Sequence, residues 1–166
     1  LEAFQPSALI HHVYICLGTT IRKAGSRENF RKVDHDYVLN LAQWALNNRV
    51  EKLAVISSMG AKQGSRNFYL RTKGEMEEDL KALGLPGLLI VRPSLLLGRR
   101  DEFRLGERLA AAVMRPVSSL FPKRSLTFKP IEAHDVASAL FKSLARLQEP
   151  VKIIENKELH RLNRDE

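Results

Sequence analysis

Three short runs of almost wholly apolar residues constrain the fold of this chain more than any other feature. They lie at residues 13–17, 53–56 and 88–91, and each is followed by loop-forming residues. Strands that are apolar throughout, rather than alternating with polar residues, are covered on both faces, as in parallel sheets. The sequence therefore predicts that these runs are interior strands of a parallel sheet.

Segments with helical spacing separate the apolar runs. Apolar residues recur every three or four positions over 33–47 and 69–83, and Gly84 follows where a C-terminal cap is expected. The remaining predicted segments are a loop over 21–30, helices over 105–114 and 134–147, and a last strand over 151–154. This alternation predicts an α/β fold, a doubly wound and mainly parallel sheet with helices on both faces.

The start of the chain departs from the usual order of such a fold. A nucleotide-binding doubly wound sheet begins with a strand, a glycine-rich turn and a helix. No G-x-G-x-x-G pattern is present, and the chain opens almost at once on the apparent interior strand at 13–17. Either the fold is a smaller one or its N-terminal part is missing, and we expect residues 1–166 to form a single domain, since this length suits one domain.

Charge and cysteine usage bear on partners and compartment. The formal net charge of +8 is compatible with nucleic-acid binding, but the basic residues are spread along the chain and no nucleic-acid-binding motif accompanies them. Cys16 is the single cysteine, and the first twenty residues lack a secretory-signal pattern. No apolar run reaches membrane-spanning length, and the histidines lack metal-ligand spacing. These features predict a soluble cytoplasmic protein without a metal centre.

The strongest chemical pattern combines a serine pair at a strand end with a tyrosine and a lysine on the following helix. Ser57 and Ser58 close the second apolar run, and Tyr69 and Lys73 are one helical turn apart on one face. An ammonium beside a phenol lowers the pKa of the phenol toward a range useful for proton transfer. The same spacing also occurs on ordinary helix surfaces, and the acidic residues over 75–79 suggest a solvated face.

A wider set of residues supports the catalytic interpretation. It comprises Cys-Leu-Gly-Thr-Thr at 16–20, Lys-Ala-Gly at 23–25, Val-Asp-His-Asp-Tyr-Val at 33–38, Ser57-Ser58, Tyr69, Lys-Gly-Glu at 73–75 and Arg92-Pro93. Over about residues 12–140 the sequence resembles atypical short-chain dehydrogenase/reductases. Within that superfamily it is most similar to the HIV Tat-interacting protein 2-like (TIP30-like) branch.

The resemblance implies that residues 1–166 form a single NAD(P)(H)-binding Rossmann-like domain that lacks its N-terminal glycine-rich βαβ portion. It also implies that NADP(H) is favoured and that the substrate is a small molecule. It implies catalytic roles for Ser58, Tyr69 and Lys73, with Ser57 as the alternative serine. The implied coenzyme contacts are Leu17, Gly18, Thr19, Tyr69, Lys73, Arg92, Pro93 and Leu96. Asp34 stands where many extended members carry an asparagine, and His134-Asp135-Val136-Ala137 resembles the start of a late structural helix.

Two functions follow from these residues. The first is an NAD(P)(H)-dependent oxidoreductase that transfers hydride to or from a carbonyl or nucleotide-sugar-like substrate. The second is a non-catalytic NAD(P)H-binding regulator, in which the same motif steers partner interactions. The sequence leaves the choice between them open, together with the substrate and the oligomeric state.

Overall fold

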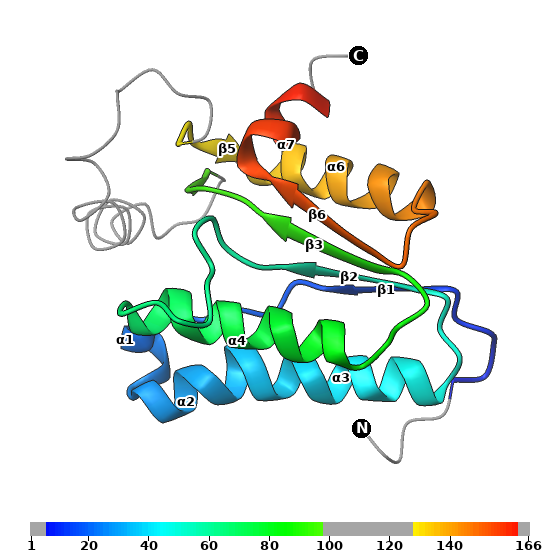
Figure 1. Ribbon diagram of the computed structural model, residues 1–166, viewed down its shortest axis with the longest axis horizontal. Helices are drawn as coiled ribbons and strands as arrows, with labels where there is room; N and C mark the ends of the chain where they lie inside the picture. The colour runs from blue at the N-terminus through cyan, green and yellow to red at the C-terminus, as the bar shows by residue number, and fades with distance from the viewer. Residues whose placement is uncertain (1–5, 98–127, 163–166) are drawn as a thin grey trace.

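Four parallel strands form the centre of the structure (Figure 1). They are β1 (His12–Ile15), β2 (Lys52–Ile56), β3 (Leu88–Arg92) and β6 (Val151–Glu155), and they lie in the order β1-β2-β3-β6. This computed structural model describes residues 6–97 and 128–162. The parallel sheet predicted from the apolar runs is confirmed, and each predicted strand is displaced by no more than a residue or two.

Helices cover both faces of the sheet, as predicted for a doubly wound fold (Figure 1). On one face α3 (Tyr37–Asn47) and α4 (Phe68–Ala82) bury apolar side chains such as Met76 and Leu80 against Val55 and Ile90. On the other, α6 (Ala133–Ala145) packs Leu140 and other apolar residues against the sheet, beside α7 (Asn156–Leu162). The central strands are apolar throughout because both of their faces are buried.

The predicted loop over residues 21–30 is wrong, because it contains two short helices. Thr20 caps α1 (Ile21–Ala24) by accepting a hydrogen bond from Lys23 N, and Ser26 caps α2 (Arg27–Arg31) in the same way. Between them Gly25 adopts a left-handed φ of 78°. These helices are stabilised by local caps and lack an apolar stripe, so hydrophobic periodicity does not reveal them.

The predicted helix over 33–47 also begins differently from the expectation. A π-helical turn, η1 (Lys32–Asp36), connects α2 to α3. Two very short strands, β4 (Leu96–Leu97) and β5 (Ile131–Glu132), and helix α7 were not predicted. The predicted helix over 105–114 lies outside the described residues. Within those residues no strand precedes β1, which forms one edge of the sheet, in agreement with a fold portion that lacks its first βαβ unit.

The loop that follows β2 lies directly against helix α4. Lys62 N donates a hydrogen bond to the carbonyl oxygen of Leu70 at 3.1 Å. A Cβ atom placed on Gly74 would lie 2.2 Å from the carbonyl carbon of Lys62. Only glycine allows this approach, and the approach sets the position of the loop that carries the chain from Ser58 to Tyr69.

We expect Gly74→Ala to lower the free energy of unfolding by about 1–3 kcal/mol, because the new methyl group must displace backbone atoms. Gly64 lies in the loop between Ser58 and Tyr69, and a Cβ atom placed on it would meet nothing within 4 Å. Gly64→Ala is therefore the matched control. Denaturant unfolding of both variants measures the difference. Equal midpoints for the two variants would contradict this account of the loop.

Candidate functional site

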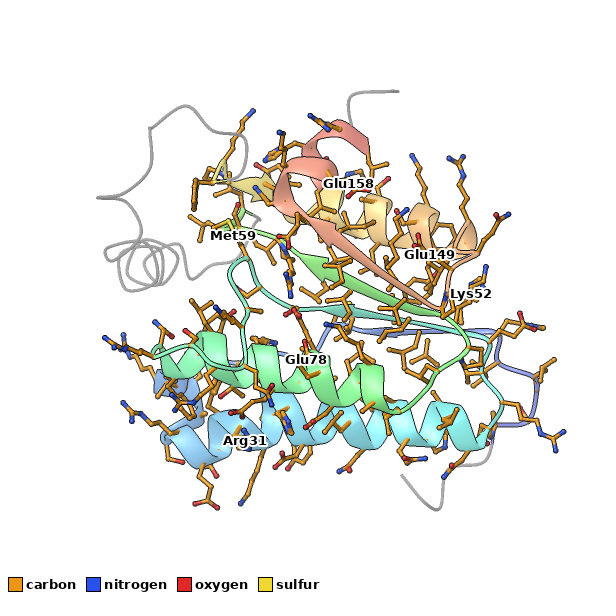
Figure 2. The ribbon with its side chains drawn as sticks, viewed as in Figure 1. Arg31, Lys52, Met59, Glu78, Glu149 and Glu158 are labelled. Carbon is orange, nitrogen blue, oxygen red and sulfur yellow. The ribbon has the colours of Figure 1, made fainter. Side chains whose placement is uncertain are left out.

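The carboxyl ends of the parallel strands lie at one edge of the sheet (Figure 1), and several predicted site residues follow these strands in the sequence. Leu17, Gly18 and Thr19 follow β1, and Leu17 and Gly18 are exposed. Ser58 follows β2, and the next residue, Met59, donates its backbone N–H to the Pro93 carbonyl at 2.9 Å. The loops after β2 and β3 are therefore joined at this edge, where Met59 is labelled in Figure 2.

A buried ion pair lies beneath the loop after β1. Lys73 Nζ is 2.8 Å from Asp34 Oδ1, and these side chains are only 4% and 1% exposed. The other carboxylate oxygen of Asp34 accepts the backbone N–H of Thr19 at 2.8 Å. Asp34 thus connects the 17–19 loop directly to Lys73, with charge-assisted bonds that offset the cost of burying both charges.

The π-helical turn holds Asp34 in this position. The next residue, His35, is buried, and its Nδ1 lies 2.8 Å from Asp36 Oδ1. Its Nε2 lies 2.9 Å from Asp79 Oδ2 on α4, which fixes η1 against that helix. Such π-type turns often occur at functional sites, because they redirect side chains that a regular helix would space differently.

The two adjacent serines have different environments. Ser57 is buried, and its hydroxyl donates to Oε1 of the fully buried Glu77. Ser58 is half-buried, and its hydroxyl lies 3.4 Å from the carbonyl oxygen of Met59. Ser57 is therefore engaged by a buried carboxylate, and the catalytic role of Ser58 stays a prediction.

Arg92 is engaged in the same polar network. Its Nε lies 3.0 and 3.2 Å from the two carboxylate oxygens of Glu77, and its Nη1 lies 2.8 Å from Glu155 Oε1. Hydrogen bonding to Glu77 raises the pKa of Arg92 above its usual range. The guanidinium therefore ties together β3, α4 and β6, and this structural role was not predicted. The solvated face suggested for residues 75–79 is wrong at Glu77, which is fully buried.

Tyr69 lies on the first turn of α4, half-buried and one turn before Lys73. Its ring packs against the buried Phe30 of α2, with the ring centroids 5.6 Å apart. Phe30 was missed because it falls in the segment predicted to be a loop. Leu96 lies 40% exposed in β4, which follows Pro93. All of the predicted coenzyme contacts stay predictions, namely those of Leu17, Gly18, Thr19, Tyr69, Lys73, Arg92, Pro93 and Leu96.

Neither a metal cluster nor a membrane-spanning helix is found in the described part of the chain. Residues 6–97 and 128–162 contain no group of three or more His, Cys, Asp or Glu side chains placed to hold a metal ion. Within the same residues, no helix combines the length and apolar character needed to cross a bilayer.

Comparisons with known proteins identify the family. No family model matches the chain. The mitochondrial protein FMP52 of Candida albicans is 38% identical over 137 residues, which cover 81% of this chain and 59% of that protein. Mitochondrial FMP52-1 of Scheffersomyces stipitis is 35% identical over 157 residues, covering 90% and 68%. HTATIP2 of Rattus norvegicus is 41% identical over 111 residues, covering 66% and 46%. The chain belongs to this family of atypical, TIP30-like short-chain dehydrogenase/reductases.

Solved structures agree with this assignment at the level of the fold. MoeE5, solved with UDP-glucose and NAD, has a TM-score of 0.64 and 13% identity, covering 94% of this chain and 62% of MoeE5. RMD from Pseudomonas aeruginosa, solved with NADPH, has a TM-score of 0.61 and 18% identity, covering 90% and 61%. The Rossmann-like fold is confirmed, and the chain spans about half to two thirds of the length of the relatives described above.

The expected cytoplasmic location is wrong. The FMP52 relatives from Candida albicans, Emericella nidulans, Debaryomyces hansenii and Scheffersomyces stipitis are all named as mitochondrial proteins. The expectation rested on a single cysteine and on the composition of twenty residues. Cysteine usage reports the redox state of a compartment and does not separate the cytoplasm from other reducing compartments.

We expect Arg92→Gln to destabilise the protein toward the lower end of about 3–5 kcal/mol, because it leaves Glu77 buried without its cation while 19% of the Arg92 side chain is exposed. Adding Glu77→Gln should recover about 1–3 kcal/mol through coupling. Glu78→Gln is the control, since its half-exposed pair with Lys81 should contribute at most about 1 kcal/mol. Additive losses in the Arg92/Glu77 double variant, measured by denaturant unfolding, would contradict a coupled buried pair.

Proposed function

We propose that the full-length protein is an NAD(P)(H)-dependent oxidoreductase that acts on a carbonyl compound at the edge formed by Thr19, Ser58 and Tyr69. The main support is the buried Asp34–Lys73 pair, which holds an ammonium group beneath the 17–19 loop and one turn from Tyr69. The nicotinamide coenzymes in the MoeE5 and RMD structures support the coenzyme class. NADP(H) is favoured by the family resemblance alone.

The residues at this edge fit a nicotinamide coenzyme. The 17–19 loop presents the exposed Leu17 and Gly18 at a strand end, and its backbone is anchored at Thr19. We assign this loop and Lys73 to coenzyme binding, with Pro93 and Leu96 as further contacts. When bound, the coenzyme supplies or accepts the hydride at the carbonyl carbon.

The side chains of this chain would manage the proton. In reduction, the Tyr69 hydroxyl donates its proton to the carbonyl oxygen, while Ser58 donates a hydrogen bond to the same oxygen. Lys73 stabilises the developing phenolate through its ammonium charge. Asp34 keeps that ammonium in place, and its own N–H partner at Thr19 prevents the carboxylate from turning away.

One observation favours the alternative function, a non-catalytic NAD(P)H-binding regulator. Asp34 lies 2.8 Å from Lys73 Nζ and balances its charge, which weakens the effect of the ammonium on a neighbouring phenol. A regulator would need the coenzyme loop but no proton transfer. The two functions therefore differ in turnover and agree in coenzyme binding.

The family also suggests where the protein works. Because FMP52 relatives are named as mitochondrial, we include a mitochondrial location in the proposal. Cell fractionation of the tagged full-length protein tests it, and exclusive recovery outside the mitochondrial fraction would argue against it.

We expect Tyr69→Phe to reduce kcat by about 10²–10⁴-fold, since the ring is kept and the acid is lost. Coenzyme affinity, measured by NADH and NADPH titration, should change little. Tyr37 on α3 is 51% exposed, so Tyr37→Phe is the matched control. The assay uses a panel of aldehydes, ketones and nucleotide sugars. Unchanged turnover in Tyr69→Phe would refute the mechanism, whereas coenzyme binding without any turnover in the unaltered protein would support the regulator.

The adjacent serines provide a second test with opposite expected effects. Ser58→Ala should reduce kcat/KM by about 10-fold or more through the loss of one hydrogen bond to the reacting oxygen, with little effect on stability. Ser57→Ala should instead lower stability by about 1–3 kcal/mol, because Glu77 loses a buried partner. Steady-state kinetics and denaturant unfolding are measured for both variants. The reverse pattern would assign the substrate-facing role to Ser57.

A further inference from the structure

Basic residues gather around the start of α4, beside the candidate proton donor. Residues 19–32 and 60–71 together contain eight Lys or Arg residues and one Glu. In the fold these segments form α1, α2, the start of η1, the loop after Gly60 and the first turn of α4. These elements lie together at the left of Figure 1. Arg31, at the end of α2, is labelled in Figure 2.

Two of these guanidinium groups lie over a single aromatic ring. The Cζ atoms of Arg27 and Arg71 are 5.3 Å and 5.6 Å from the centroid of the Phe68 ring. Phe68 immediately precedes Tyr69, and the Phe30 ring contacts both, with centroid separations of 5.8 Å and 5.6 Å. The two cations therefore contact the residue that directly precedes the proposed acid in the sequence.

Nearby carboxylates leave this pair incompletely neutralised. Glu75 forms an ion pair with Arg31, and its distance of 3.9 Å from Arg71 Nε is long for a hydrogen bond. Among the residues that the structure describes, no ion pair of Arg27 is found, and the neighbouring Glu28 pairs with Lys32 at 3.1 Å. Arg71 Nη1 donates to the Ser65 carbonyl, which carries no compensating charge.

The two guanidinium groups near this ring carry like charge, so their positive potentials add, and an anion that binds beside them lowers their repulsion. Arginine suits such a role, because its planar fork can donate two parallel hydrogen bonds to a phosphate or a carboxylate. Stacking on Phe68 also limits the conformations of both side chains before a ligand arrives, which reduces the entropy lost on binding.

We propose that Arg27 and Arg71, placed over Phe68, form an anion subsite that binds the phosphate or carboxylate group of the substrate. The substrate is then an anionic carbonyl compound, with its reacting oxygen at Tyr69 and its anionic group at the subsite. This inference rests on the proposed function for the identity of the ligand, but anion binding can be measured without turnover.

The first experiment titrates inorganic phosphate and, separately, malonate into the full-length protein by calorimetry. The double variant Arg27→Gln/Arg71→Gln should weaken the binding of at least one probe by about 10- to 100-fold, since charge-assisted hydrogen bonds are lost. Arg22 and Arg66 are exposed in the same basic segments, and within the described residues the cation–π contacts of Phe68 are with Arg27 and Arg71. Arg22→Gln/Arg66→Gln is therefore the charge-matched control and should keep the unaltered affinity. Comparing the two probes separates a phosphate from a carboxylate ligand.

The second experiment compares matched substrates in turnover. Glyceraldehyde phosphate is paired with glyceraldehyde, and succinic semialdehyde with butanal. The unaltered protein should show a lower KM for at least one charged member. The double variant should lose that preference by about 10- to 100-fold and keep its kcat for the uncharged member. Arg27→Lys/Arg71→Lys keeps the charge without the planar guanidinium fork. Its preference for the charged substrate should therefore lie between those of the unaltered protein and the Arg→Gln double variant.

The outcomes separate the subsite from the oxidoreductase. Arginine-dependent anion binding without turnover of any substrate supports the subsite and removes the oxidoreductase proposal. Turnover with no preference for charged substrates and no anion binding removes the subsite alone. Equal weakening of anion binding in the Arg22/Arg66 control would show that a diffuse positive field binds the anion, which overturns the subsite. A separate binding assay uses anionic lipid vesicles. Saturable vesicle binding that neither phosphate nor malonate competes with would also overturn the subsite.

Discussion

The buried ion pair between Asp34 and Lys73 is the interaction on which the arrangement of the site depends. Its two charges come from different elements, η1 and α4, and its second carboxylate oxygen is held by the backbone of Thr19. Removing either partner would leave an uncompensated charge in a nearly water-free position, at a cost of about 3–5 kcal/mol. The loop after β1, the π-helical turn and α4 are therefore held in one relative position.

Helix α4 carries a second buried charge one turn further on, with the opposite sign. Lys73 interacts with Asp34 on the side of β1, whereas Glu77 interacts with Ser57 and Arg92 on the side of β2 and β3. Apolar packing of Met76 and Leu80 holds the helix against the sheet. Because the hydrophobic effect is not directional, it does not by itself fix the position of the helix along the strands. The two directional charge pairs fix that position, and Tyr69 lies on the same helix, one turn before Lys73.

The sequence predicted the elements whose signal is local and missed those that depend on distant partners. The strands and helices α3, α4 and α6 follow from apolar patterns that a short window contains. The burial of Glu77 depends on Arg92, fifteen residues away, and Arg92 in turn pairs with Glu155, sixty-three residues away. Nothing in the acidic run over 75–79 separates Glu77 from the half-exposed Glu78. Helices α1 and α2 and the π-helical turn were missed for a different reason, because local caps and a π-helical turn have no apolar period to reveal them.

The fold gathers basic residues that are far apart in the sequence. Along the chain the basic residues look scattered, but the fold brings two basic segments to the first turn of α4. Inside the site the ammonium of Lys73 is already neutralised by Asp34, so it adds little long-range attraction. Within the described residues, Arg27 and Arg71, near the first turn of α4, are not neutralised in this way. Charges at the edge of a site guide an anionic ligand to it more than they determine the chemistry. If both proposals hold, charge recognition rests on the exposed Arg27 and the half-buried Arg71, whereas positioning of the proton donor rests on the buried Lys73.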